Sequence, residues 1–405
     1  MSYPREKLKN FIDVLSGFAF KSKDFTSAGV PVIKIKNVTP PTVTLDDLSY
    51  VSKEIAQAQN RFLLNYDDVL IALTGSHINQ MASVVGRVAR VRHQTPSLLN
   101  QRVGKITVIN PDEMDLDYVY YYLSQDLIKI QLASKAGGAA NQANISPSDV
   151  KNLDIPFPDI DVQRRISGIL SAYDNLIENN QKQIKLLEEA AQRLYKEWFV
   201  DLRFPGYEDT PIVDGVPEGW TLGELGDIAI DSGKKEKKEH RGQYQYYLPI
   251  DCLPKRSLAY TDKNDITLAE SSLVAFMPND ILFGAMRPYF HKVVVARDKG
   301  LTRTTCFVIN SKMPAYWAYL LLLLFSKDTV DHATQISVGT TMPYVRWKDF
   351  IHMPTLIPPE EKCDAFQAIV LPIIERISCL AVSSERLIQA RDRSLPKLMS
   401  GEIEV

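Results

Sequence analysis

Two stretches of the chain carry hydrophobic residues at spacings that alternate between four and three. The first runs from Ile166 to Trp198, and the only polar position in its seam is Asn180. The second runs from Phe366 to Leu398 in the same phase, with seven of its ten seam positions apolar. Such a regular seam predicts two long helices that pair as a coiled coil. The alternative is that each is an ordinary amphipathic helix packed on its own domain.

The predicted seam of the first helix consists of Ile166, Leu170, Tyr173, Ile177, Ile184, Leu187 and Leu194. In the second helix the matching residues are Phe366, Val370, Ile373, Ile377, Leu380 and Leu387. Pro372 lies inside the second stretch, so we expect a kink or an interruption there, because proline lacks the backbone donor that a helix interior needs.

The chain also repeats itself outside these helices. Pro158–Ile166 matches Pro358–Phe366 at an offset of 200, and Asp67–Ile71 matches Asn279–Phe283 at an offset of 212. A drift of this kind is what loop insertions between two copies of a domain produce. The sequence therefore predicts a pseudo-two-fold internal repeat, and that symmetry makes the two paired helices antiparallel.

Each copy predicts a globular domain of mixed α/β (α+β) class, because it combines short β-branched runs with one helical stretch. The predicted strands include Val30–Val38, Val69–Thr74, Val103–Ile109 and Lys292–Ala296, and the predicted helical stretches are Asp117–Leu132 and Tyr316–His332. We place the first domain at 1–155, the central helix at 156–204, a linker at 205–218, the second domain at 219–357 and the C-terminal helix at 358–405.

Composition excludes several classes of protein. The 405 residues are 45% hydrophobic and 24% charged, which is ordinary for globular domains. The longest apolar run, Tyr316–Phe325, is about half of what a bilayer-spanning helix needs, so we expect a core helix and no membrane partner. Four cysteines without a Cys-x-x-Cys pair, and no secretory signal, suit a cytoplasmic protein.

No catalytic motif stands out in the sequence. It lacks a phosphate-binding loop, a dinucleotide fingerprint, a His-Glu-x-x-His zinc motif and an Asp-Pro-Pro-Tyr methyltransferase box. The six histidines show no metal-ligand spacing, so we expect no catalytic residue, metal or cofactor in this chain. Asp112, Asp149 and Lys151 form a loose nuclease-like pattern, which keeps a metal-dependent nuclease as an alternative.

Local charge favours a nucleic-acid partner, although the net charge of −2 does not. No acidic residue lies between Asp68 and Asp112, and the matching stretch Ile281–Lys327 has only Asp298. Polar loops flanked by glycine lie near both stretches, and their side chains can approach base edges closely. The candidate DNA-binding residues are Thr74, Ser76, Asn79, Arg87, Arg102, Asn141 and Gln142 in the first copy, and Lys234, Lys235, Arg287, Tyr289, His291, Arg303, Thr340 and Arg346 in the second.

Taken together, these features resemble the specificity (S) subunits of type I restriction–modification systems. The residues that carry the resemblance are Ser16–Phe20, Val216–Trp220, the helix entries at Pro158 and Pro358, and the helix ends Leu194–Phe199 and Leu395–Ile403. The order of these motifs and their repetition cover essentially the whole chain.

The resemblance implies two target recognition domains, each reading one half of a split sequence in double-stranded DNA. It implies that the antiparallel helices space these domains and dock two methyltransferase (M) subunits, which bind S-adenosylmethionine and methylate adenine. Restriction (R) subunits are further implied partners. Besides the nuclease, a coiled-coil scaffold that does not bind DNA remains an alternative.

Overall fold

The structure is a computed structural model that describes residues 3–137 and 142–405. The chain divides into two compact units, unit 1 with Met1–Asp174 and Gln389–Val405, and unit 2 with Asn175–Ile388. Two long helices, α5 (Ile160–Tyr195) and α10 (Glu360–Ser400), contribute to both units. Domain 1 denotes the part of unit 1 before α5, and domain 2 the part of unit 2 between α5 and α10.

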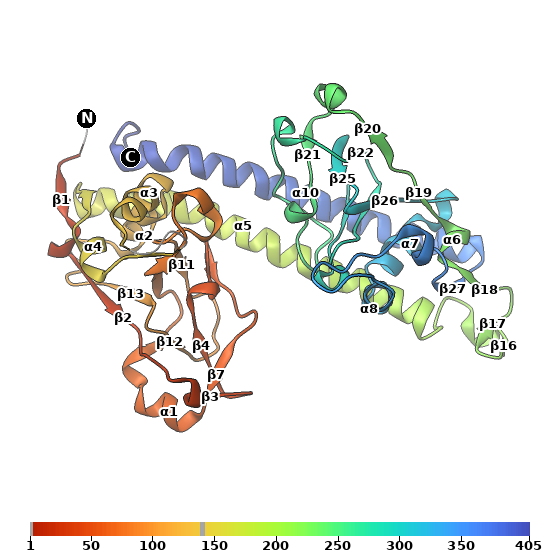
Figure 1. The fold of residues 1–405 in the computed structure, drawn as a ribbon, viewed down its shortest axis with the longest axis horizontal. Coiled ribbons are helices and arrows are strands. Elements are labelled where there is room, and N and C mark those ends of the chain that lie inside the picture. Colours follow the sequence, from red (N-terminus) through yellow and green to blue (C-terminus); the bar gives the residue numbers. More distant parts are fainter. Residues whose placement is uncertain (1–2, 138–141) are drawn as a thin grey trace. The chain divides into compact units, whose positions relative to one another are not determined.

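Domain 1 contains two main β-sheets (Figure 1). The first has the order β2 (Ile12–Ser16), β13 (Val103–Val108), β9 (Val69–Ala72), β11 (Val88–Arg90), β6 (Thr42–Val43) and β5 (Val38–Thr39). The second has the order β3 (Phe25–Thr26), β7 (Ser49–Val51), β4 (Val30–Ile33), β12 (Ser97–Leu99) and β8 (Leu63–Leu64). The helices are α1 (Lys53–Ala58), α2 (Leu116–Ser124), α3 (Asp126–Lys135) and α4 (Pro147–Lys151), and β1 (Arg5–Lys7) pairs with β15 (Asp154–Pro156).

Domain 2 is built on the same plan. Its first sheet has the order β19 (Ala229–Asp231), β26 (Cys306–Ser311), β23 (Ile281–Gly284) and β24 (Val293–Val295). Its second sheet has the order β20 (Lys234–Glu236), β22 (Leu273–Phe276), β25 (Gly300–Arg303) and β21 (Tyr246–Tyr247). The helices are α6 (Leu225–Ile228), α7 (Trp317–Leu324), α8 (Lys327–Gln335) and α9 (Trp347–Phe350), and β18 (Thr221–Glu224) pairs with β27 (Pro354–Ile357).

The strand order confirms the predicted mixed α/β repeat. The four strands β2-β13-β9-β11 of domain 1 recur as β19-β26-β23-β24 in domain 2, in the same spatial order. In both domains a pair of helices follows the second strand of this set, α2 and α3 in one and α7 and α8 in the other. The hydrophobic pattern therefore builds one topology twice.

Within each unit, α5 and α10 pack together through predicted seam residues and, on α10, through residues next to the seam. In unit 1, Ile166 and Leu170 share a buried core with Leu395 and Leu398. In unit 2, Ile184 and Ala191 of α5 share a core with Ile374, Ile377 and Ala381 of α10. Early residues of α5 thus meet late residues of α10, and late residues meet early ones, which is the antiparallel arrangement that the repeat predicts.

Burial along the two helices follows the seam with small deviations. Asn180 is buried, and its side-chain amide donates a hydrogen bond to the Ser383 hydroxyl at 3.3 Å. The fully buried predicted seam residues are Ile166, Leu170, Ile177, Ile184, Phe366, Val370, Ile377 and Leu380, whereas Tyr173, Leu187, Leu194, Ile373 and Leu387 are half-buried.

The predicted interruption at Pro372 is wrong, because α10 continues through this residue. Pro372 is exposed, while Val370 and Ile374 on either side of it are buried in the core of unit 2. Burial of that apolar face outweighs the missing backbone hydrogen bond on the solvent side.

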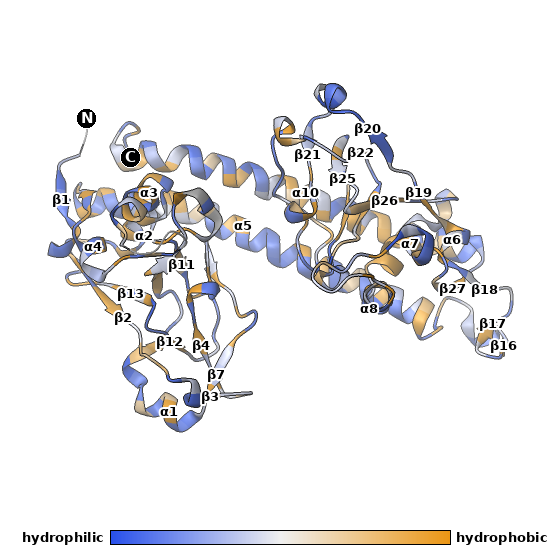
Figure 2. Cartoon of the chain, in the orientation of Figure 1, coloured by the Kyte–Doolittle hydropathy of each residue, from blue (hydrophilic) through white to orange (hydrophobic). Residues whose placement is uncertain are grey.

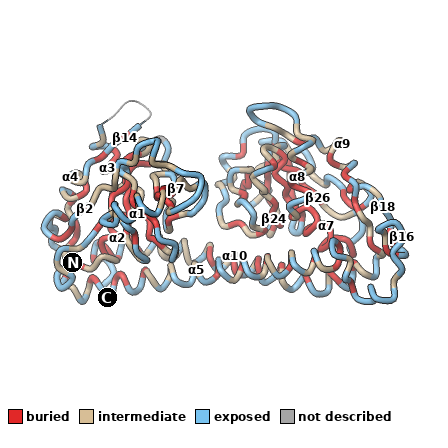
Figure 3. Tube along the Cα trace, turned by 90° about the horizontal axis from the view of Figure 1, so that it is seen from below, coloured by how far each residue is buried: buried red, intermediate tan, exposed pale blue. Residues whose placement is uncertain are grey.

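Two helices are apolar enough to raise the question of a membrane. The leucine-rich α7 is entirely buried in unit 2, as expected of a core helix (Figure 3). By length and composition alone α10 could cross a bilayer, since an 18-residue window has a mean hydropathy of 1.7. Its residues Phe366, Val370 and Ile377, however, are buried in the core of unit 2.

The predicted linker 205–218 contains a 3-10 turn (Tyr207–Asp209) and a short hairpin of β16 (Ile212–Val213) and β17 (Val216–Pro217). The compact units differ from the predicted domain boundaries in one respect. Each long helix is divided between the two units rather than forming a separate segment.

Candidate nucleic-acid interface

In domain 1, a short strand pair brings two predicted DNA-binding loops together. β10 (Thr74–Gly75) pairs antiparallel with β14 (Ala143–Asn144), with Thr74 opposite Asn144. The segment that follows β9 therefore crosses the segment that follows α3. Within unit 1, β14 lies on the side of the domain remote from α5 (Figure 3).

Domain 2 repeats this crossing. Met286 pairs antiparallel with Tyr344, and the backbone N–H of Arg287 donates to the Pro343 carbonyl at 2.7 Å. Thr74 and Met286 are separated by 212 residues, and Asn144 and Tyr344 by 200, which are the offsets found in the sequence repeat. Each domain thus brings two of its own loops side by side, and these loops occupy equivalent positions in the repeat.

The structure places the predicted DNA-binding residues in different environments. Arg102, Gln142, Lys234, Lys235, Tyr289, Arg303, Thr340 and Arg346 are exposed, whereas Ser76, Arg87, Arg287 and His291 are half-buried and Thr74 is buried. The side chain of Asn79 and the whole of Asn141 lie outside the described residues.

Three of the predicted residues hold their own domain together. The Thr74 hydroxyl donates to the side-chain carbonyl of Asn144 at 2.8 Å, and the Ser76 hydroxyl donates to the Gln80 carbonyl at 2.7 Å. His291 Nε2 lies 3.0 Å from the Phe325 carbonyl oxygen, and burial lowers the pKa of this imidazole. Thr74 and His291 therefore support the loops.

The acid-free stretch of domain 1 is less positive in space than in sequence. Arg90 pairs with Asp117, Arg92 with Asp67 and Lys105 with Asp68, each with a nitrogen–oxygen distance of 2.6 Å. All three carboxylates come from outside the stretch. The expectation that its cations lack acidic neighbours is wrong for these residues, and Arg102 is the cation of this stretch that lies exposed.

An exposed pair of cations lies on β20, where Lys234 and Lys235 occupy an edge strand of the second sheet. Figure 2 shows β20 and the turn beyond it as a hydrophilic stretch. The acid of this strand, Glu236, accepts a hydrogen bond from the Tyr244 hydroxyl at 2.7 Å, and this contact is the main cause that lowers its pKa to about 2. Its charge is thus engaged within the segment, while Lys234 and Lys235 face solvent.

The sequence reasoning missed two further cations, Lys255 and Arg256. Both are exposed, and both contact the segment 287–291: Lys255 Nζ lies 4.5 Å from the centre of the Phe290 ring, and the Arg256 N–H donates to the His291 carbonyl at 2.7 Å. Their only sequence signal is a Pro-Lys-Arg tripeptide outside the acid-poor stretch. The folded chain brings it beside that stretch.

Several known proteins have sequences similar to this chain. Residues 5–189 match a family described as "Type I restriction modification DNA specificity domain". The chain is 26% identical to the type I restriction enzyme MjaIX specificity subunit of Methanocaldococcus jannaschii, covering 99% of this chain and 93% of that protein. A second relative from that organism, the putative MjaX specificity subunit, is 22% identical over 98% of this chain and 93% of its own length.

Residues 5–189 belong to this family, and nearly the whole chain is similar to type I restriction enzyme specificity subunits. The crystal structure of the S subunit from M. genitalium has the same fold, with a TM-score of 0.58 at 16% identity, over 98% of this chain and 96% of that one. The predicted resemblance is thereby confirmed.

Two residues of the nuclease-like pattern have structural explanations. Asp149 accepts hydrogen bonds from the backbone N–H and hydroxyl of Ser146, both at 2.7 Å, and so caps α4. Lys151 pairs with Asp13 at 3.1 Å. Within residues 3–137 and 142–405, no group of three or more His, Cys, Asp or Glu side chains could hold a metal ion.

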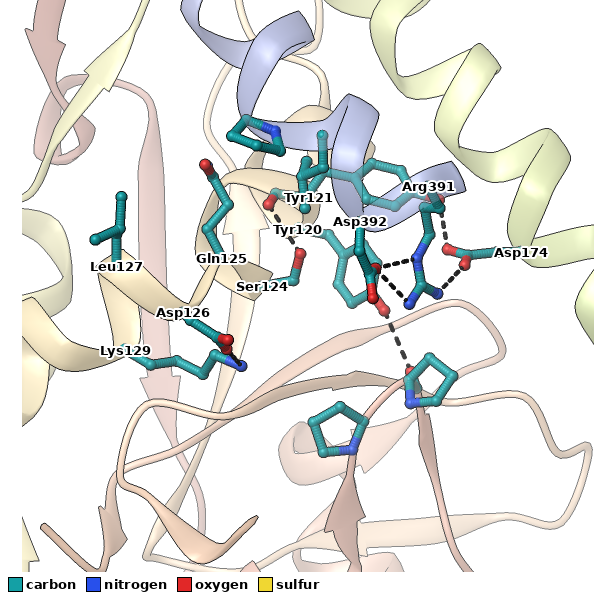
Figure 4. A pocket seen from close by; sticks show the side chains of 14 residues that line it. Tyr120, Tyr121, Ser124, Gln125, Asp126, Leu127, Lys129, Asp174, Arg391 and Asp392 are labelled. Atoms are coloured by element: carbon teal, nitrogen blue, oxygen red, sulfur yellow. Dashed lines mark hydrogen bonds and ion pairs between the residues drawn. The ribbon is translucent and has the colours of Figure 1, made fainter. Parts of the chain in front are cut away.

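Unit 1 also contains a cavity of about 420 Å³ beside the start of α3 and the end of α10 (Figure 4). Its charged groups pair with one another. Arg391 contacts Asp174 at 2.6 Å and Asp392 at 2.8 Å, and the Tyr121 hydroxyl donates to Asp174 at 2.7 Å. This network connects α2, α5 and α10 within unit 1, which gives it a structural role.

Proposed function

We propose that this chain is the DNA sequence-specificity subunit of a type I restriction–modification complex, with domain 1 reading one half of a split target and domain 2 the other. The loop crossing that occurs in both domains carries this proposal. Gln142 and Thr340 are exposed in the segments that form the crossing, and each domain also exposes an arginine, Arg102 beside the crossing in domain 1 and Arg303 on β25 of the second sheet in domain 2. Different exposed residues in the two domains predict two different half-sites.

In this proposal the long helices act as the spacer. α5 has 36 residues, which at about 1.5 Å per residue makes it about 54 Å long. One turn of B-DNA is about 34 Å. A spacer longer than one turn suits two readers that leave unread base pairs between their half-sites.

Catalysis belongs to partners in this proposal. Two methyltransferase subunits would dock on the two equivalent halves of the chain, bind S-adenosylmethionine and methylate adenine, and restriction subunits would join them. The chain itself would hold no cofactor and would work in the cytoplasm with the DNA. The relatives named above are themselves specificity subunits of restriction enzymes, which supports this division of labour.

Methylation mapping tests the proposal. The chain, co-assembled with its methyltransferase subunit, should methylate adenine within one bipartite motif in a DNA library randomised in both halves. Arg102→Ala should weaken or relax only one half of the motif, and Arg303→Ala only the other, by about 1–3 kcal/mol if the arginine reads a base.

A complex that binds or methylates DNA without sequence preference would instead support the scaffold alternative. Equal changes in both halves for either variant would contradict the assignment of one half-site to each domain. Lys312→Ala is the control, because Lys312 is an exposed cation outside the proposed reading loops.

A further inference from the structure

An aromatic side chain stands at the apex of a tightly held turn in domain 2. The Tyr289 turn (Pro288–Phe290) is a 3-10 turn flanked by Arg287 and His291, which have φ angles of 50° and 52°. The left-handed region is unfavourable for residues with a Cβ atom, and such residues cluster at functional sites where the surrounding structure holds them.

Both ends of the Tyr289 turn are anchored. At one end, Arg287 donates from its backbone to the Pro343 carbonyl at 2.7 Å and from its guanidinium to the Thr341 carbonyl at 3.3 Å. At the other end, the ring of His291 packs against Phe325, with its Nε2 3.0 Å from the Phe325 carbonyl oxygen. The turn is therefore fixed to the crossing loop and to the end of α7.

This anchoring leaves Tyr289 47% exposed. Its neighbour Phe290, with ring centres 4.8 Å apart, carries the Lys255 ammonium 4.5 Å above its own ring. Arg256 joins the turn through its backbone and is exposed as well. An exposed aromatic ring thus lies in a turn that two cations border.

Domain 1 has an exposed apolar side chain in the matching turn, one position beyond the residue that aligns with Tyr289 at the offset of 212. The Ile78 turn (Ile78–Ser83) follows the β10–β14 crossing, as the Tyr289 turn follows the Met286–Tyr344 bridge. The Ile78 turn packs against α3, and the Tyr289 turn against the equivalent helix α8. Ile78 is 53% exposed.

We propose that Tyr289 and Ile78 are specificity-determining residues, each making apolar contact with base edges in the half-site that its domain reads. The inference rests on the proposed function and assigns side chains to it. Thymine presents a methyl group in the major groove, which is the base feature that an apolar side chain recognises. Lys255 and Arg256 contact the flanking phosphates, because exposed cations beside a reading element position the protein on the duplex.

The test uses the chain assembled with its methyltransferase subunit and a DNA library randomised in both half-sites. Tyr289→Ala should lower discrimination about tenfold or more at one or two base pairs of a single half-site. Tyr289→Phe should retain discrimination within about threefold, because the ring makes the contact. The matched control is Tyr207→Ala, which removes a tyrosine that is 41% exposed in the segment between α5 and β18.

In domain 1, Ile78→Ala should relax the other half-site, with Ile109→Ala as control because Ile109 is 61% exposed and lies outside the crossing. Lys255→Ala should weaken binding to all sequences equally and lower the salt slope by about one. Thermal melting of each variant checks that the fold is intact.

The outcomes separate this inference from the proposed function. A wild-type complex without any sequence preference would overturn both. A specific wild-type complex whose motif is changed no more by Tyr289→Ala than by Tyr207→Ala would overturn only the assignment of Tyr289. Relaxation of both half-sites by Tyr289→Ala would also overturn it.

Discussion

Arg90 and Arg102 belong to the same acid-free stretch of sequence but occupy opposite environments. Arg90 is buried against Asp117, with its guanidinium 4.2 Å from the Tyr120 ring, whereas Arg102 is exposed. Asp117 and Tyr120 both come from α2, which the sequence does not connect to β11. Residue spacing can therefore identify a region rich in cations, but tertiary pairing decides which of them can reach DNA.

Glu188 shows the same dependence on the fold, since it is a charged residue in the middle of a buried helix face. Its carboxylate accepts hydrogen bonds from the Ser257 hydroxyl and the Leu258 N–H, both at 2.7 Å. Burial raises its pKa above the ordinary value of 4.5, and these hydrogen bonds offset only part of that effect. Glu188 thereby fixes the segment around Leu258 to α5 within unit 2.

This burial predicts a pH-dependent effect of Glu188→Gln on stability. Because the folded pKa is raised, the stability that Glu188 contributes is present below the unfolded pKa and is lost as pH rises through the folded pKa. Glutamine keeps an acceptor and carries no charge. The free energy of unfolding of the variant relative to wild type should therefore rise by on the order of 1 kcal/mol between about pH 4 and pH 8.

Urea unfolding at both pH values measures this difference. Glu189→Gln, at the neighbouring position of the helix, is the control and should show no comparable trend. A constant difference for Glu188→Gln would mean that burial does not perturb this carboxyl group.

At the scale of elements, periodicity predicted where structure forms better than where it ends. The predicted strands Val69–Thr74 and Val103–Ile109 correspond to β9 and β13, within two residues at each end. The predicted helical stretch Asp117–Leu132 is instead two helices, because Gln125 adopts an extended conformation between α2 and α3. The apolar pattern continues across this break, so hydrophobicity alone gives no sign of it.

Proline 372 offers a direct test of what holds α10 together. Proline in a helix interior is about 3 kcal/mol less favourable than alanine, yet α10 is uninterrupted here. Pro372→Ala should therefore raise the free energy of unfolding by about 1–3 kcal/mol. Urea unfolding checks this against Leu371→Ala, which changes an exposed neighbour and should not stabilise the protein. No gain for Pro372→Ala would show that the local geometry already accommodates proline at no cost.

At the scale of the whole molecule, the repeat was visible in sequence because its offsets are nearly constant. The pairing of the sheets was not visible, since strands adjacent in space are far apart in the chain, as β2 and β13 are. The position of the basic edge strand β20 was likewise not visible in the sequence. Its lysines were found by sequence, but their place at the sheet edge, beyond β22, came from the fold.

The whole-molecule charge makes that edge strand testable. With a net charge of −2, the protein as a whole does not attract DNA, so affinity must come from local cations.

Each lysine of β20 that neutralises a phosphate should contribute about one unit to the slope of log affinity against log salt. Lys234→Ala and Lys235→Ala should each lower the slope by about one, and together by about two, while the methylated motif stays the same. Lys312→Ala, an exposed control, should leave the slope unchanged. A salt slope unchanged in both β20 variants would show that this strand does not contact DNA. A changed methylated motif would show that its lysines contact bases rather than phosphates.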